Sequence, residues 1–285
     1  MNAIEIKNLT KEYDTNFKLG EINLNIPSGQ IIGLIGENGA GKTTLIKLIL
    51  NIIRPTTGSI KIFNKDYLKY ESIIKEDIGI VLDNMFFPEI LTPKDINLIM
   101  KDIYKNWSST LYFNYLEKFQ IPLNKQIKTL SKGMRKKLEI AVSLSHSPKL
   151  LILDEPTSGL DPVVRNEVID IFLEFIKDEA HTILLSTHIT TDLEHIADNI
   201  IFIDKGKILL EDTKDNLIDN YGILKCSPED FTNIDKKDII TYKKNKYDYH
   251  ILINNKQKLT KKYKDYTIDK ITLEDLMILM IKGEK

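Results

Sequence analysis

A glycine-rich loop stands between an apolar run and an amphipathic segment near the N-terminus of this chain, and it restricts the possible folds strongly. Residues 30–35 predict a buried strand, and the apolar spacing of residues 45–52 predicts a helix. Between them lies the pattern G-x-x-x-x-G-K-[ST], which consists of Gly36, Glu37, Asn38, Gly39, Ala40, Gly41, Lys42 and Thr43, with Thr44 directly after it. In this context the backbone N–H groups can surround a phosphate, Lys42 can contact the β and γ phosphates, and the Thr43 hydroxyl can bind Mg²⁺.

A second motif follows an apolar run at residues 150–153, where Asp154, Glu155 and Pro156 come directly after four apolar residues. At the end of a buried strand, Asp154 is placed to hold Mg²⁺ through water, and Glu155 can act as a general base toward an attacking water. Residues 182–186 form another short β-type run, separated from the first by a helical pattern at 162–178. This βαβ arrangement predicts a parallel sheet.

The remaining patterns predict an α/β fold with additional parts. Alternating apolar residues in the first 30 positions predict antiparallel strands, and residues 84–148 predict a helical subdomain. Residues 200–204 and 207–210 predict a closing hairpin. After about residue 212 the composition changes to lysine, tyrosine and asparagine, ending in a predicted helix at 273–281. We therefore divide the chain into a nucleotide-binding domain, 1–212, and a small α+β extension, 213–285.

Composition excludes several classes of protein. The 285 residues carry a net charge of −1, which argues against a surface that coats nucleic acid, so no nucleic-acid partner is expected. The single cysteine excludes an internal disulfide framework. No stretch approaches the about 20 apolar residues that cross a bilayer, and the N-terminus lacks the apolar core of a signal peptide. We expect a cytosolic chain, with any membrane span in a separate partner.

The segment Leu130-Ser131-Lys132-Gly133-Met134 connects these motifs to a known family. It resembles the LSGGQ signature of the ATP-binding subunits of ABC transporters, and it departs from that signature at Lys132 and Met134. From the residues alone, Ser131 is a good N-cap for a helix over residues 134–144. The resemblance covers about residues 3–212. It implies a P-loop NTPase fold with a mostly parallel core sheet, ATP and Mg²⁺ as ligands, and ATP hydrolysis.

The resemblance also implies roles for residues outside the two motifs. Tyr13 stands where the family stacks an aromatic ring on adenine, although Phe17 could serve instead. Asp161 belongs to a segment that resembles the D-loop, which bridges two subunits in relatives. His188, at the end of a predicted strand, resembles the histidine that senses the γ-phosphate. Asp83 occupies the place of a glutamine that approaches Mg²⁺ or water, and Asn84 could take part in its stead.

Partners follow from the same resemblance. In the family, the signature residues act on ATP bound to the opposite subunit, so a homodimer or pseudo-dimer of ATPase subunits is expected. A separate transmembrane permease is expected as well, which would place the chain peripherally on the inner face of the cell membrane. The region Phe86-Phe87-Pro88 could form the groove for that permease, or it could be ordinary core packing.

Several functions remain open at this level. Residues 132–137 and the C-terminal segment resemble those of bacterial ABC exporters of drugs or peptide antibiotics. An importer ATPase and a soluble ABC-type ATPase acting on ribosomes or DNA are the alternatives. A nucleotide-gated regulatory protein without turnover is disfavoured by Glu155, because a degenerate site would lose its base. The lysine-rich tail is interpreted as a solvated face, because acidic residues are mixed in. The extension could contact a second subunit.

Overall fold

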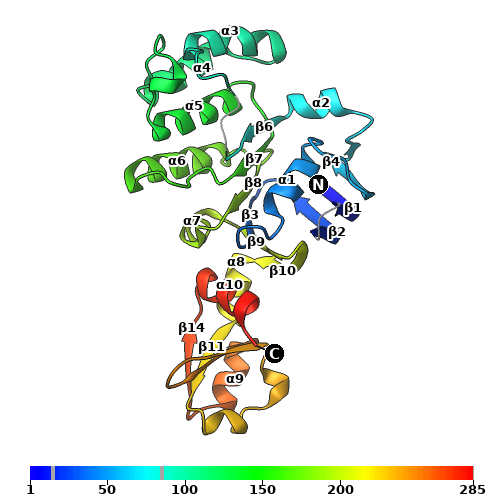
Figure 1. Ribbon diagram of the computed structural model, residues 1–285, viewed down its shortest axis with the longest axis vertical. Coiled ribbons are helices and arrows are strands. Elements are labelled where there is room, and N and C mark those ends of the chain that lie inside the picture. The colour runs from blue at the N-terminus through cyan, green and yellow to red at the C-terminus, as the bar shows by residue number, and fades with distance from the viewer. Residues whose placement is uncertain (14–16, 84–86, 285) are drawn as a thin grey trace.

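A mostly parallel sheet forms the centre of the molecule in the computed structural model, which describes residues 1–13, 17–83 and 87–284 (Figure 1). Its strand order is β10-β9-β3-β8-β7-β6, and only the edge pair β9–β10 is antiparallel. The strands are β3 (Ile31–Ile35), β6 (Ile78–Val81), β7 (Leu150–Asp154), β8 (Thr182–Thr187), β9 (Asn199–Asp204) and β10 (Lys207–Thr213). All residues of β3, β7 and β8 are buried, as expected for parallel strands covered on both faces.

An antiparallel sheet packs beside the first helix. It has the order β2-β1-β4-β5 and consists of β1 (Asn2–Glu12), β2 (Lys18–Pro27), β4 (Thr57–Ile62) and β5 (Lys65–Asp66). The alternating apolar residues of β1 and β2 face one common core with α1 (Lys42–Ile49) and with one face of the central sheet. The helix that follows the glycine-rich loop is therefore held from two sides, which fixes the position of its N-terminus.

Helices cover the other face of the central sheet and form a separate helical layer above it (Figure 1). They are α3 (Pro93–Ile103), α4 (Ser109–Lys118), the 3₁₀ turn η1 (Ile127–Thr129), α5 (Lys132–Leu144), α6 (Pro162–Phe175) and α7 (Thr190–Ile196). The short helix α2 (Glu71–Glu76) packs instead through Ile74 into the core shared by the antiparallel sheet and α1. The start of α3 is encoded locally, because Thr92 and Asp95 form a capping box with Pro93 in the first turn. None of the described helices combines the length and the apolar character needed to cross a membrane.

The C-terminal part has its own sheet, with the order β12-β13-β11-β14. Its elements are α8 (Lys214–Asn220), β11 (Gly222–Cys226), η2 (Asp230–Asn233), η3 (Lys236–Asp238), β12 (Thr241–Lys244), β13 (Tyr249–Ile253), α9 (Lys256–Lys262), β14 (Thr267–Lys270) and α10 (Leu273–Lys282). Figure 1 shows α10 on the side of this part that faces the rest of the molecule. It packs on α7, where the Glu194 carboxylate accepts a 2.8 Å hydrogen bond from Leu273 N.

Several predicted element boundaries differ from the structure, and the helix predicted at 45–52 lies instead at Lys42–Ile49. The helix predicted from residue 134 begins at Lys132, because the Ser131 hydroxyl accepts the Met134 N–H and so caps the first turn. The helix predicted to residue 178 ends at Phe175, because the Asp178 carboxylate forms a turn with Ala180 N. Strand β10 extends to Thr213, one residue beyond the boundary drawn at 212.

The shared core between α10 and α7 gives a stability prediction. Leu276 is fully buried in the same cluster as Leu193 and Ile196 of α7. Leu276→Ala should lower the free energy of unfolding by about 2–5 kcal/mol, because it removes buried methyl groups and leaves a cavity. Leu98→Ala is the matched control, since Leu98 lies in a helix but is 59% exposed. Equal effects in urea titrations would contradict the placement of α10.

Candidate active site

The carboxyl ends of β3, β8, β7 and β6 meet at one edge of the central sheet, and the loops that leave them enclose a cavity. In open α/β sheets this edge is the usual ligand site. The cavity has a volume of about 340 Å³ and is lined by Phe17, Glu37, Asn38, Gly39, Gly41, Lys42, Thr43, Thr44, Asp83, Asp154 and Glu155. Three separate sequence segments predicted to act together are thus brought to one place.

The glycine-rich loop wraps around the ammonium group of Lys42. Lys42 Nζ donates to Gly36 O at 2.6 Å and to Glu37 O at 3.2 Å, and the residue is 6% exposed. Gly41 has a φ of 112°, which a side chain would strain, so glycine is needed at the N-cap of α1. Burial lowers the pKa of the Lys42 ammonium, while the nearby carboxylates of Glu155 and Asp154 oppose this shift. The N-terminus of α1 and Lys42 together present positive potential to the cavity.

Asp154 at the end of β7 is linked to the first turn of α1. Thr43 Oγ1 donates to Asp154 Oδ2 at 2.9 Å, and Asp154 is 2% exposed. The other carboxylate oxygen, Oδ1, is buried and has no hydrogen-bond partner among the described residues. A buried carboxylate oxygen without a donor is costly unless a ligand completes it. A hydroxyl beside such a carboxylate is a donor set that fits Mg²⁺.

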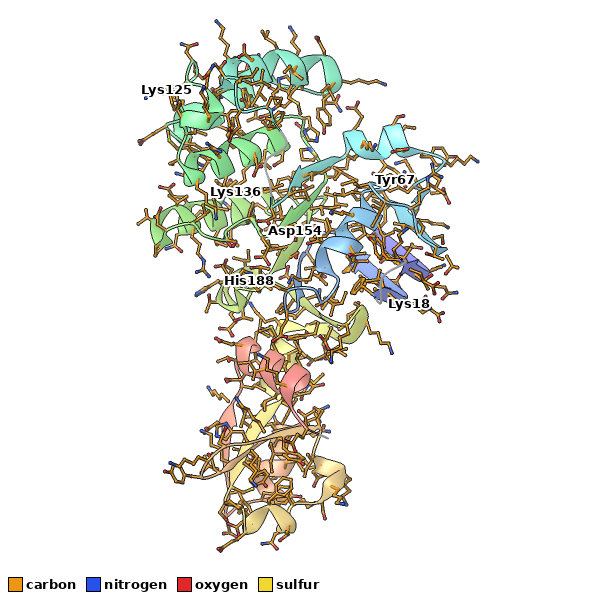
Figure 2. All side chains as sticks on the ribbon, viewed as in Figure 1. Lys18, Tyr67, Lys125, Lys136, Asp154 and His188 are labelled. Atoms are coloured by element: carbon orange, nitrogen blue, oxygen red, sulfur yellow. The ribbon has the colours of Figure 1, made fainter. Side chains whose placement is uncertain are left out.

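Glu155 and His188 lie together at the ends of β7 and β8. His188 Nδ1 is 2.8 Å from Glu155 Oε2, and Lys42 Nζ is 3.9 Å from Glu155 Oε1. The backbone of Glu155 has a φ of 52°, in the left-handed region, and its N–H donates to Ser186 O at 2.9 Å. Neighbouring β8 therefore holds Glu155 in a strained conformation that turns its carboxylate into the cavity. Figure 2 labels Asp154, the last residue of β7, and His188, which directly follows β8.

A buried carboxylate behind the site, Asp192, could not be predicted from the sequence motifs. Asp192 of α7 accepts from Thr157 Oγ1 at 2.7 Å and from Arg165 Nε at 2.5 Å, and its side chain is 5% exposed. It therefore joins the segment after Glu155, the start of α6 and the helix after His188. An acidic residue in a helix is usually solvated, so its type alone does not indicate burial. The sequence feature that could have indicated it is the apolar Ile196, which lies four residues later and therefore on the same helix face.

Only some of the other predicted site residues line the nucleotide cavity among the residues that the structure describes. Asp83 lines the cavity, whereas Asn84 and Phe86 lie outside the described residues. Phe17 lines the cavity, whereas Tyr13 does not and is 40% exposed. The ring centroids of Tyr13 and Phe17 are 6.3 Å apart. Gly36 contributes its carbonyl to Lys42, and Ala40 is buried, its carbonyl bonded to the N–H of residue 206.

The signature segment lies at the N-terminus of α5 and does not line the cavity. None of Ser131, Lys132, Gly133 and Met134 lines the cavity of its own chain. Ser131 caps α5, and Asp161 caps α6 by accepting from the N–H groups of residues 163 and 164. The Lys132 side chain lies against Gly159, where a Cβ would collide with the ammonium group. Ser131 and Asp161 thus have structural roles in the single chain.

Comparisons with known proteins agree with this geometry. The family described as ABC transporter matches residues 19–158. The lantibiotic transport ATP-binding protein SrtF of Streptococcus pyogenes is 38% identical over 210 residues, covering 73% of this chain and 90% of that protein. The bacitracin transport ATP-binding protein BcrA of Bacillus licheniformis is 36% identical over 216 residues, covering 75% and 71%. A solved ATP-binding subunit of an ABC transporter superposes with a TM-score of 0.69 at 27% identity, covering 75% and 91%.

Proposed function

Because this chain belongs to the ATP-hydrolysing subunits of ABC transporters, we propose that it powers export of a drug or peptide antibiotic through a separate membrane permease. The observation that carries this proposal is the similarity to two subunits whose names state transport of a lantibiotic and of bacitracin. The similarity covers most of the length of both relatives. Import is the alternative, and the export experiment below separates the two.

Nucleotide binding is proposed to use the positive end of the cavity. The γ-phosphate of ATP lies beside Lys42, whose ammonium exchanges its contacts with loop carbonyls for phosphate oxygens. Thr43 and Asp154 hold Mg²⁺, and Asp83 lies at the same cavity wall. Mg²⁺, when bound, supplies charge to neutralise the phosphate oxygens. The unpartnered Asp154 Oδ1 supports this assignment.

Glu155 is proposed as the general base for hydrolysis. Its carboxylate accepts a proton from a water, the water oxygen forms a bond to the γ-phosphorus, and the bond to the β–γ bridging oxygen breaks to give ADP and phosphate. His188 contacts Glu155 Oε2 and so orients the carboxylate, and its own side chain is 48% exposed. The two carboxylates thereby divide the work: Asp154 binds metal and Glu155 moves a proton.

A dimer of ATPase subunits is proposed to complete each site. The signature residues lie outside the cavity of their own chain, so they are free to contact ATP held by another subunit. Ser131 caps α5 with its lone pair and retains its O–H as a donor. ATP that bridges two subunits favours the closed dimer, and loss of the γ-phosphate removes that bridge. Two-fold symmetry suits this arrangement because each chain offers both halves.

An apolar groove between β6 and the helical layer is proposed to bind the permease. It has a volume of about 310 Å³, and its lining includes Ile52, Ile80, Phe87, Met100 and Tyr104. Ile52 and Ile80 are 55% and 37% exposed, so apolar surface is available there. An amphipathic helix end of a membrane protein matches such a groove. This groove would place the chain on the inner face of the membrane, with the helical layer toward the permease.

Phe17 is proposed as the residue that stacks on adenine, in preference to Tyr13. Of these two described residues, Phe17 lines the cavity and Tyr13 does not. Phe17→Ala should weaken ATP binding by about 1–3 kcal/mol, the range for a base stacked on an aromatic ring. Tyr13→Ala is the matched control and should leave the Kd within about twofold, which calorimetric titration can resolve. A larger loss for Tyr13→Ala would reverse the assignment.

The domain division is proposed to lie after β10. The central sheet ends with Thr213, and the residues beyond it form a separate sheet with its own core of Leu224, Ile251, Ile253 and Leu259. The extension is nevertheless joined to the ATPase part through α10 and α7. Lys282 at the end of α10 also pairs with Glu37 of the glycine-rich loop at 2.9 Å.

Export is tested by purifying the chain from membranes and reconstituting what copurifies. A multi-spanning protein should copurify, and inside-out vesicles should accumulate a labelled lantibiotic or bacitracin when ATP is added outside. Accumulation in right-side-out vesicles loaded with ATP would establish import instead. Copurification with ribosomes or DNA and no membrane protein would reject transport.

A further inference from the structure

A buried ion pair lies where α5 packs against the end of β6. Lys136 Nζ is 2.9 Å from Glu139 Oε2, and the two side chains are 7% and 9% exposed. Burial raises the pKa of the Glu139 carboxyl, and the Lys136 ammonium opposes that shift. Removing two charges from water carries a large desolvation cost, and an apolar pair of similar volume often serves packing as well or better. The pair therefore points to a role other than stability.

Lys136 also holds the main chain at the end of β6. Its ammonium donates to Leu82 O at 2.9 Å. β6 is an edge strand of the central sheet, and Leu82 directly follows it. The next residue is Asp83, which lines the nucleotide cavity together with Asp154 and Glu155. The position of Lys136 on α5 is marked in Figure 2.

We propose that Lys136 is a positioning residue for ATP hydrolysis, an inference that rests on the proposed function. By holding the Leu82 carbonyl, Lys136 fixes the position of the main chain directly before Asp83. This in turn fixes where the Asp83 carboxylate lies in the cavity. Because α5 starts directly after Ser131, the same contact ties the signature helix to the nucleotide site. Glu139 neutralises the buried ammonium and keeps it aimed at Leu82.

The ion pair also reaches the proposed permease groove. Glu139 and Leu82 both line that groove, beside Phe87. A segment bound in the groove therefore contacts the carboxylate that holds Lys136, and a shift of this carboxylate reaches Asp83 through one hydrogen bond. Groove and nucleotide cavity share this short connection.

The test removes the connection without leaving a buried charge unpaired. The double variant Lys136→Met/Glu139→Leu replaces the ion pair by apolar residues, a change that is often neutral or stabilising. The matched control is Lys137→Met/Glu167→Leu, which removes an ion pair between the neighbouring Lys137 of α5 and Glu167 of α6 that has no bond to Leu82. Lys136→Arg keeps a donor and serves as the conservative variant. Each is combined with Asp83→Ala.

In the full-length chain, the Lys136/Glu139 variant should lower kcat about 10-fold, as small misplacements at active sites do, with KM for Mg-ATP changed less than about twofold. The control should stay within about twofold of the unmodified chain, and Lys136→Arg should retain most of the activity. In the Asp83→Ala background, removing the pair should change kcat by less than about twofold, because coupled residues are not additive.

Two results would overturn the inference: an unchanged kcat in the Lys136/Glu139 variant, or the full loss of kcat again in the Asp83→Ala background. Circular dichroism checks folding, and if the double variant does not fold, Lys136→Gln goes through the same cycle. The proposed function has a separate test, because it would be overturned if the unmodified chain neither bound nor hydrolysed ATP. Equal rates of hydrolysis in the unmodified chain and the Lys136/Glu139 variant would overturn only the role of Lys136.

Discussion

Glu155→Gln should lower kcat for ATP hydrolysis by about 10²–10⁴-fold, the contribution of a positioned general base. The amide has the shape of the carboxylate but cannot accept a proton from water. It can still contact His188, which lies 2.8 Å from Oε2, so the site should keep its form. ATP binding should therefore persist, and stalled hydrolysis should cause a closed dimer to accumulate. Steady-state kinetics and size-exclusion chromatography with Mg-ATP measure both effects.

Two companion variants define the role of Glu155. Glu179→Gln is the matched control, because Glu179 is exposed beyond α6, and it should hydrolyse ATP at the native rate. Asp154→Asn should instead weaken Mg²⁺ binding and raise the Mg²⁺ concentration needed for half-maximal activity, because Asp154 bonds Thr43 and carries the unpartnered oxygen. Hydrolysis by Glu155→Gln at the native rate would show that the base lies elsewhere.

Lys42→Met should weaken ATP binding by about 10- to 100-fold, because it removes a charge-assisted contact to phosphate worth about 1.5–3 kcal/mol. The loss is enhanced by what remains in the cavity. Asp154 and Glu155 lie close enough to Lys42 to affect its pKa, and without the ammonium their charges repel the phosphates. Titration with a fluorescent ATP analogue gives the Kd.

The control for this variant lies on the same helix. Lys47→Met removes an exposed lysine from the last turn of α1, and its Kd should stay within about twofold of the native value. A thermal melt verifies that both variants are folded. Native affinity in Lys42→Met would mean that ATP does not enter the glycine-rich loop.

Local patterns were sufficient to predict the family and the fold class, both of which are confirmed. The glycine-rich loop specified its own conformation through residues such as Gly41, whose φ of 112° suits glycine. Strands β3, β7 and β8 are continuous apolar runs, a pattern typical of buried parallel strands. The site residues at their ends could be named because parallel strands bring their carboxyl ends to one edge.

Contacts between distant segments could not be predicted in this way. The contact of Lys136 with Leu82 depends on how α5 packs against β6, and 54 positions separate the two residues. The contact of Asp192 with Arg165 depends on the packing of α7 against α6. The choice between Tyr13 and Phe17 depends on the path of the chain between β1 and β2. The roles of the individual site residues remain predictions.

A crystal structure of Glu155→Gln with Mg-ATP would locate the nucleotide and its ligands. We expect the γ-phosphate beside Lys42, Mg²⁺ bound by Thr43 and Asp154, and adenine against Phe17. We also expect a two-fold dimer in which the partner subunit's Ser131 contacts the same γ-phosphate. Nucleotide bound away from the ends of β3, β7 and β8, or a site completed by Ser131 of the same chain, would contradict this arrangement.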